Sequence, residues 1–160
     1  MEFEGARTAI VTGGAKPIGA ALCRALAEDG WHLLIHCNRS RAEAEALAAE
    51  LGNAAVVQAE LGDPDAAERV FAGLEGLPPP KLLVNNASRF DYDSAGDFTV
   101  ERWDAHMAIN LRAPALLSQA FAARVEGGQR ARAVRPADRA PALDLGRAVV
   151  RGVRARRQRD

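Results

Sequence analysis

The chain has 160 residues, of which 48% are hydrophobic and 26% are charged, and its formal net charge is zero. This composition and length are typical of a single folded domain with a hydrophobic core. No apolar run reaches the roughly 20 residues that cross a bilayer, and the charged residues 1–7 do not form a secretory signal, so we expect a cytoplasmic protein without a membrane segment.

Four short apolar runs predict strands, at residues 8–11, 31–36, 54–57 and 81–84. Near-continuous apolar runs of this length are typical of strands that are buried on both faces of a parallel sheet. Helical patterns separate the runs, and the connections are short. The alternation predicts right-handed crossovers in a Rossmann-type, doubly wound parallel α/β sheet that is incomplete at its C-terminal side.

The first predicted helix spans residues 18–29 and ends before Gly30, a residue type that favours helix C-termini. Ser40 can cap a second helix that Gly52 closes, and Asp63-Pro64 predicts the start of a third, with the proline in the first helical position. The apolar residues that we expect the first helix to turn toward the sheet are Ile18, Ala21, Leu22, Ala25 and Leu26.

A longer helical region follows the fourth strand and a polar loop at 85–97. It opens at Thr99 and runs through Arg124, with an interruption at 110–114. The pair Gly127-Gly128 is expected to end it.

A glycine-rich segment, Thr12-Gly13-Gly14-Ala15-Lys16-Pro17-Ile18-Gly19, joins the first strand to the first helix. In such a fold this turn binds a pyrophosphate, because free backbone N–H groups and the positive end of the helix dipole point at the ligand. Glycines at positions 13, 14 and 19 permit the turn and the close approach of the backbone to the ligand. The alternative is a turn with a structural role only.

The end of the second strand carries His36-Cys37-Asn38-Arg39-Ser40, without the carboxylate that grips the adenosine ribose of NAD. Arg39 offers a bidentate fork for a phosphate, Ser40 adds a hydroxyl, and Lys16 adds a second cation. The sequence therefore favours NADP(H) over NAD(H). The alternative is that Arg39 is an ordinary solvated loop charge.

Four separately placed motifs resemble those of the short-chain dehydrogenase/reductase family: Thr12-Gly13-x-x-x-Pro17-x-Gly19, Glu60-Leu61, Asn85-Asn86-Ala87-Ser88 and Asn110. The resemblance covers roughly residues 7–126, which we take as the NADP-binding domain (1–126). Lys16, the His-x-x-Arg-Ser turn at 36–40 and Asn-Asn-Ala-Ser look most like the pteridine reductase branch, which includes dihydromonapterin reductases. Pro17 departs from the family pattern and removes one N–H donor.

The resemblance implies roles for these residues. Glu60 would read the adenine amino group with the Leu61 backbone nearby, and the Asn85 motif would hold the nicotinamide side. Asn110 would be the catalytic Asn that breaks its helix and holds a water; alternatively it is only a polar helix residue. The expected cofactor-binding residues are Gly13, Lys16, Ile18, Gly19, Arg39, Ser40, Glu60, Leu61, Asn85, Asn86, Ala87 and Ser88.

Partners follow from the same resemblance. The helices within 99–124 would pair subunits into a homo-oligomer, a dimer or tetramer, although their apolar residues could instead face the sheet. These residues are Leu111, Ala115, Leu116, Ala120 and Phe121. A small-molecule substrate would bind beside Phe90 and Tyr92, a position that favours a flat ring. We expect no membrane partner.

The family transfers hydride between nicotinamide and a carbonyl or imine carbon, with a pterin as the candidate substrate of this branch. Its acid is a Tyr with a Lys four residues later, but Tyr92 is followed by Gly96, and the lysines are Lys16 and Lys81. A positioned general acid is worth about 10² to 10⁴ in rate. We therefore expect this chain to be inactive alone. The alternative is a non-catalytic nucleotide-binding or oligomerisation subunit.

Residues 127–160 differ from the rest of the chain. They carry 10 Arg and 3 Asp, whereas residues 1–126 carry 11 Lys or Arg and 18 Asp or Glu. A fifth strand is expected after Gly128, but the segment lacks its apolar pattern, and one hypothesis is a shifted reading frame. The rival hypothesis, a nucleic-acid arm, is disfavoured because the segment has no aromatic residue for stacking. Cys23 and Cys37 lack metal-ligand spacing and are expected to be reduced thiols.

Overall fold

The structure is a computed structural model that describes residues 5–92 and 94–130. The strands are β1 (Thr8–Val11), β2 (His32–Cys37), β3 (Ala54–Gln58) and β4 (Pro80–Val84). The helices are α1 (Pro17–Glu28), α2 (Arg41–Leu51), α3 (Ala66–Ala72), α4 (Val100–Met107), the π-helical segment η1 (Ala108–Arg112) and α5 (Ala113–Arg130). The unit Met1–Gly128 is compact by its own contacts, and the account below concerns this unit.

The sheet has the order β3-β2-β1-β4, and every pair is parallel. Val11 at the end of β1 is in register with Ile35 of β2 and with Val84 of β4, so the carboxyl ends of these strands lie at one edge. The chain steps outward from β1 to β3 and then returns to the other side of β1. The predicted doubly wound parallel sheet is confirmed.

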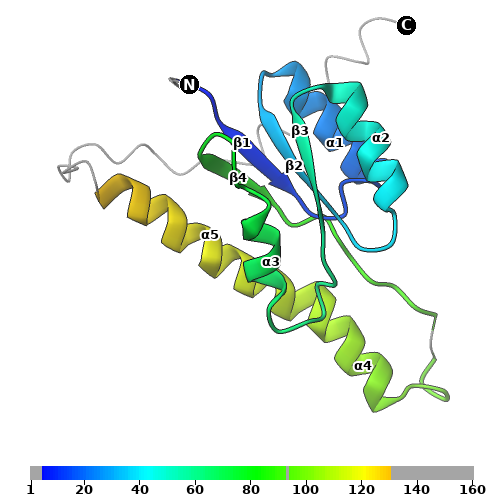
Figure 1. Cartoon of the computed structure of the whole chain (residues 1–160). Coiled ribbons are helices and arrows are strands. Elements are labelled where there is room, and N and C mark those ends of the chain that lie inside the picture. The colour runs from blue at the N-terminus through cyan, green and yellow to red at the C-terminus, as the bar shows by residue number, and fades with distance from the viewer. Residues whose placement is uncertain (1–4, 93, 131–160) are drawn as a thin grey trace, which may run out of the picture. The chain divides into compact units, whose positions relative to one another are not determined.

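Two hydrophobic clusters cover the two faces of the sheet. Figure 1 shows α1 and α2 on one side of the sheet and α3 and α5 on the other. Because side chains alternate along a strand, neighbours on β1 and β2 enter different clusters. Ile10 and Leu34 pack with α3 and with the buried Leu117 of α5, while Leu33 and Ile35 pack with α1 and α2. The predicted burial on both faces holds for β1 and β2, while β3 and β4 are only partly buried.

The predicted sheet-facing side of α1 is wrong. Ile18 is 72% exposed, and the buried residues of the helix are Gly19 and Cys23, with Leu26 shared between the prediction and the observed face. Alanines on several sides of the helix left its apolar face ambiguous. The absence of a side chain at Gly19 and the small side chain of Cys23 let the helix approach the turn after β1 closely, which favours this orientation.

Helix ends agree with the predictions in part. Gly52, directly after α2, has φ +74°, and Gly30, one residue after the Asp29 C-cap of α1, has φ +79°, as expected for glycines at helix C-termini. Thr99 caps α4 by accepting from the Arg102 N–H. Ser40 is at the N-cap of α2, but its side chain makes no capping hydrogen bond.

Two other predicted boundaries are wrong. α3 starts at Ala66, because residues 63–65 form a turn in which the Ala66 N–H donates to the Asp63 carbonyl. α5 continues through Gly127 and Gly128 to Arg130, since a glycine ends a helix only where its backbone turns to positive φ. The predicted interruption of the long helical region is confirmed as η1, and it begins at Ala108, two residues earlier than expected.

Within the described ranges, no helix is both long and apolar enough to cross a membrane. The expected fifth strand, the shifted-frame hypothesis and the nucleic-acid arm concern the segment 127–160, of which residues 131–160 lie outside the described residues.

Candidate functional site

A cavity of about 700 Å³ lies at the carboxyl edge of the sheet. Its walls come from the glycine-rich turn after β1, the end of β2, residues 60–61 after β3, residues 86–91 after β4, and Ile109 of η1. In open parallel sheets, ligands bind outside the carboxyl ends of the strands where the strand order reverses, which here is between β1 and β4. Figure 1 shows the chain leaving β1 and β4 at the same edge of the sheet. The volume suits a small-molecule ligand.

The glycine-rich turn is packed so closely that side chains do not fit. Gly13 has φ +63°, and a Cβ added there would lie 3.0 Å from the Ala87 Cα. A Cβ on Gly19 would overlap the Gly13 carbonyl oxygen and the Gly14 Cα, which are backbone atoms that cannot swing away. The turn and α1 therefore require glycine at both positions, and the backbone is left bare toward the cavity.

Fewer backbone N–H groups of this turn are free to bind a ligand than the sequence indicated. The Gly13 N–H donates to His36 Nδ1 at 3.2 Å, the Gly14 N–H donates to the His36 carbonyl at 3.0 Å, and the Lys16 N–H donates to the Gly13 carbonyl. Pro17 has no N–H. The amide of Ala15, for which no hydrogen bond is found within the described residues, and the first-turn amides of Ile18 and Gly19, which have no partner within the helix, are therefore the ones available to a ligand.

His36 is a site residue to which sequence reasoning gave no role. It is 2% exposed at the end of β2, where its Nδ1 accepts from Gly13 and its Nε2 lies 3.0 Å from the Ala59 carbonyl. This pattern places the ring hydrogen on Nε2. Burial lowers the pKa of His36, so the ring is neutral. A polar residue at the end of an otherwise apolar strand was the available signal, because such a group needs partners when it is buried.

One end of the cavity is rich in positive charge. Lys16 and Arg39 are exposed on its wall, and within the described part of the chain neither forms an ion pair. Ser40, mostly buried, follows Arg39 in the chain and is at the start of α2. The positive end of that helix also favours an anion. The three residues predicted to hold a phosphate thus line the same cavity.

Glu60 and Leu61 both line the cavity, but in different ways. The Glu60 carboxylate accepts from Asn38 Nδ2 at 2.6 Å and from the Gly62 N–H at 3.0 Å, so its oxygens are already oriented by the chain. The Leu61 side chain is buried in the cluster beneath α3 and α5. Only the backbone of Leu61 is left for a ligand, as the sequence predicted.

Asn86 links the loop after β4 to the glycine-rich turn. Its Nδ2 donates to the Thr12 carbonyl at 2.9 Å and to the Gly13 carbonyl at 3.2 Å. The Thr12 hydroxyl accepts from the N–H groups of Asn86 and Ala87, each at 3.0 Å. The Asn86 side chain is therefore committed to the backbone of the turn, while Ala87 and Ser88 lie along the cavity wall.

Asn85 is the predicted cofactor-binding residue that the structure does not bring to the cavity. Its Nδ2 donates to Ser118 Oγ of α5 at 3.3 Å. Successive residues of an extended segment point in opposite directions, so Asn85 and Asn86 cannot both face the glycine-rich turn. The sequence motif alone did not show which of the two does.

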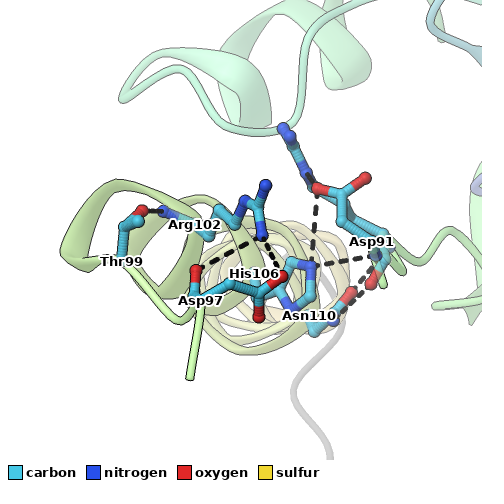
Figure 2. Close-up of polar contacts among 7 residues, drawn as sticks. Asp91, Asp97, Thr99, Arg102, His106 and Asn110 are labelled. Atoms are coloured by element: carbon cyan, nitrogen blue, oxygen red, sulfur yellow. Dashed lines mark hydrogen bonds and ion pairs between the residues drawn. The ribbon is translucent and has the colours of Figure 1, made fainter. Parts of the chain in front are cut away.

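Asn110 holds the loop after β4 from the helix side (Figure 2). Its Oδ1 accepts from the Arg89 N–H and its Nδ2 donates to the Arg89 carbonyl, both at 2.8 Å. The side chain that projects from η1 into the cavity wall is that of the neighbouring Ile109. One turn earlier, His106 Nε2 accepts from the Asp91 N–H at 3.1 Å. His106 has no counterpart among the residues predicted from the sequence.

Comparison with known proteins identifies the family. A model described as short chain dehydrogenase matches residues 7–135. The chain belongs to the short-chain dehydrogenase family. The short-chain dehydrogenase/reductase FrzI of Cladobotryum sp is 40% identical over 119 residues, which are 71% of this chain and 46% of that protein.

Solved structures of the family share the fold. FolM alternative dihydrofolate reductase 1 from Brucella suis, crystallised in complex with NADP, is 37% identical with a TM-score of 0.70, covering 76% of this chain and 52% of that one. Angucycline C-6 ketoreductase LanV with bound NADP is 30% identical with a TM-score of 0.70, covering 74% and 50%. The chain thus spans about half the length of the relatives that it matches.

Proposed function

We propose that this chain is the NADP(H)-binding part of a short-chain oxidoreductase. The observation that carries the proposal is that Lys16, Arg39 and Ser40 line the same cavity, and that the two cations form no ion pair within the described part of the chain. A phosphate on the adenosine ribose fits this group, because a guanidinium binds phosphate in a bidentate manner and a helix N-terminus favours anions. The family relatives crystallised with NADP support it.

The remaining residues accommodate a dinucleotide between this group and the loop after β4. The Ile18 and Gly19 amides would hold the pyrophosphate over the bare backbone of Gly13. Glu60, oriented by Asn38, and the Leu61 backbone would hold the adenine. Ala87 and Ser88 would face the nicotinamide, with Asn86 keeping their loop against the turn.

The phosphate preference is testable by fluorescence titration of the chain with NADPH and with NADH. We expect tighter binding of NADPH, and we expect Arg39→Ala to weaken NADPH binding about tenfold to a hundredfold without changing NADH binding, since a charge-assisted hydrogen bond is worth about 1.5–3 kcal/mol. Arg41→Ala is the matched control, because Arg41 is two residues away and already pairs with Glu45 at 2.7 Å. Equal affinities of the native chain for NADPH and NADH would overturn the assignment.

For the substrate, we propose a flat ring carrying a carbonyl or imine, with a pterin as the first candidate. Phe90 lines the cavity with its side chain 74% exposed and makes an edge-to-face contact with Tyr92 at 5.0 Å between ring centroids. An exposed aromatic face beside the nicotinamide end offers a stacking surface for such a ring. The 37% identity to a FolM protein, described as a dihydrofolate reductase, supports the pteridine branch.

Bound NADPH would supply the hydride. Asn110, as the proposed catalytic Asn, and the loop that it holds would orient the reacting end of the site. The 160 residues contain no Tyr-x-x-x-Lys, and we propose that the chain binds cofactor without turning it over. Loss of NADPH absorbance with dihydropterin or quinonoid substrates tests this. Turnover by the chain alone contradicts the inactivity proposal, and NADPH binding without turnover leaves the second candidate, a nucleotide-binding or oligomerisation subunit.

For the partners, we propose a homo-oligomer formed through α4 and α5, in a cytoplasmic setting. Ala113 and Leu117 face the sheet, whereas Trp103 of α4, Leu111 of η1 and Leu116 of α5 are exposed. Exposed apolar side chains gathered on neighbouring turns favour contact with another protein surface. The molar mass in solution, compared between the native chain and Leu111→Glu, tests whether this surface pairs subunits.

A further inference from the structure

We propose that His106 is a positioning residue that fixes the segment Arg89–Phe90–Asp91 as the wall of the ring end of the cavity. The inference rests on the proposed function, because it concerns how the same site holds the nicotinamide end of NADPH. Three residues of one loop line the cavity here, and two residues of one helical stretch hold their backbone.

The backbone is held by hydrogen bonds on both sides of Phe90. Asn110 binds both the N–H and the carbonyl of Arg89, and His106 binds the N–H of Asp91. Positions 106 and 110 are four residues apart, so they lie on neighbouring turns of one helical face. The Phe90 ring is 74% exposed and its aromatic contact is with Tyr92 of the same loop, so we expect its direction to depend on the backbone on either side.

The contacts of His106 define what it does. Its Nε2 lies 3.1 Å from the Asp91 backbone nitrogen and 3.5 Å from Asp91 Oδ2. The nearer partner is a donor, so Nε2 acts as the acceptor and the ring hydrogen is on Nδ1. The carboxylate is instead held by Arg89 Nε at 2.6 Å, and this guanidinium lowers the pKa of Asp91 below its usual range. Figure 2 shows both contacts of His106 with Asp91, and the shorter one is to the loop backbone.

A purely structural role for His106 would weaken the whole fold and every ligand equally. A positioning role would weaken only the binding of ligands that reach the ring end. Lys16 and Arg39, which we propose bind the phosphate, belong to different loops, after β1 and β2. The two roles are therefore separated by ligands that reach different parts of the cavity. NADPH reaches both ends, and adenosine 2′,5′-bisphosphate reaches only the phosphate end.

The experiment compares His106→Leu, His106→Gln and the control Asp104→Leu, which places a leucine at an exposed site of the same helix. We expect His106→Leu to weaken NADPH binding about threefold to tenfold, the effect of one lost hydrogen bond, and to reduce the emission gain of the bound nicotinamide. Binding of adenosine 2′,5′-bisphosphate should not change. His106→Gln, whose amide oxygen can accept from the Asp91 N–H, should restore NADPH binding, and Asp104→Leu should resemble the native chain.

The outcomes are distinct. Native affinity and emission in His106→Leu would overturn the inference, as would equal weakening of both ligands or a failure of glutamine to restore binding. Failure of the native chain to bind adenosine 2′,5′-bisphosphate would instead overturn the proposed function itself. Thermal unfolding of each variant identifies a folding defect, in which case His106→Gln, compared with the native chain at a temperature where both are folded, decides the result.

Discussion

The two ends of the cavity are built differently. At the phosphate end, Lys16 and Arg39 reach into solvent without an ion-pair partner among the described residues. At the ring end, the polar side chains of Asn86, His106 and Asn110 are bonded to the backbone of the loops. At the phosphate end, charged side chains are free to contact a ligand, whereas at the ring end polar side chains hold the loop backbone in place. Substitutions at the first should alter affinity for a phosphate, and those at the second should alter the fold of the site.

The largest effect should come from the turn that joins the two ends. Gly19→Ala would push a Cβ into the Gly13 carbonyl and the Gly14 Cα, and overpacking of this kind destabilises by about 1–3 kcal/mol. We expect a lower denaturant midpoint together with loss of NADPH binding. Gly96→Ala is the control, because its added Cβ would have only Ser94 Oγ nearby, at 3.7 Å. Native stability of Gly19→Ala would show that the turn is looser than described.

Asn86 and Asn85 provide a matched pair for the ring end. Asn86→Ala removes the donor to two part-buried carbonyls and should destabilise by about 1–3 kcal/mol, because those groups lose their partner. Asn85→Ala removes one exposed contact to Ser118 and should change stability by about 0.5 kcal/mol or less. Urea unfolding of the two variants checks the difference. Equal effects would contradict the assignment of the two side chains.

A smaller, pH-dependent effect on stability is expected from His36, whose Nδ1 accepts a hydrogen bond from the Gly13 N–H in the glycine-rich turn. Burial lowers its pKa from the ordinary value of 6.5, so the unfolded chain takes up this proton more readily than the folded chain. The contribution of neutral His36 to the free energy of unfolding is therefore fully present above pH 6.5 and is lost as the pH falls toward the lowered pKa. Unfolding midpoints between pH 7 and pH 5 should drop more for the native chain than for His36→Gln. Parallel pH profiles of the two proteins would contradict this role.

The sequence was informative where one residue type has one physical use. Gly30 and Gly52 predicted helix ends because positive φ favours glycine, and the apolar runs predicted the parallel strands. The three phosphate-end residues were found because a cation and a hydroxyl beside a helix start serve few other purposes. All three line the same cavity, and their ligand is a proposal.

The sequence was less informative where several arrangements bury the same residues. Alanine-rich α1 gave no unique apolar face, so Ile18 was expected inward and lies outward. Gly127 was expected to end α5 but is compatible with helical φ. His106 and Asp91 are 15 residues apart in the chain, and their contact depends on how a loop folds onto a helix, which no local pattern contains.

The π-helical turn at Ala108–Arg112 determines how the side chains of α5 are rotated about the helix axis relative to those of α4. The Ala113 N–H bonds the Ala108 carbonyl five residues back, so the turn accommodates one more residue than an α-helical turn does. Removing one residue from it would rotate α5 by about 100° relative to α4. Ala113 and Leu117 could then not face the sheet while Asn110 and His106 still reach the loop. The π-helical turn thus lets one continuous helical stretch pack α5 against the core while residues of α4 and η1 hold the loop that lines the cavity.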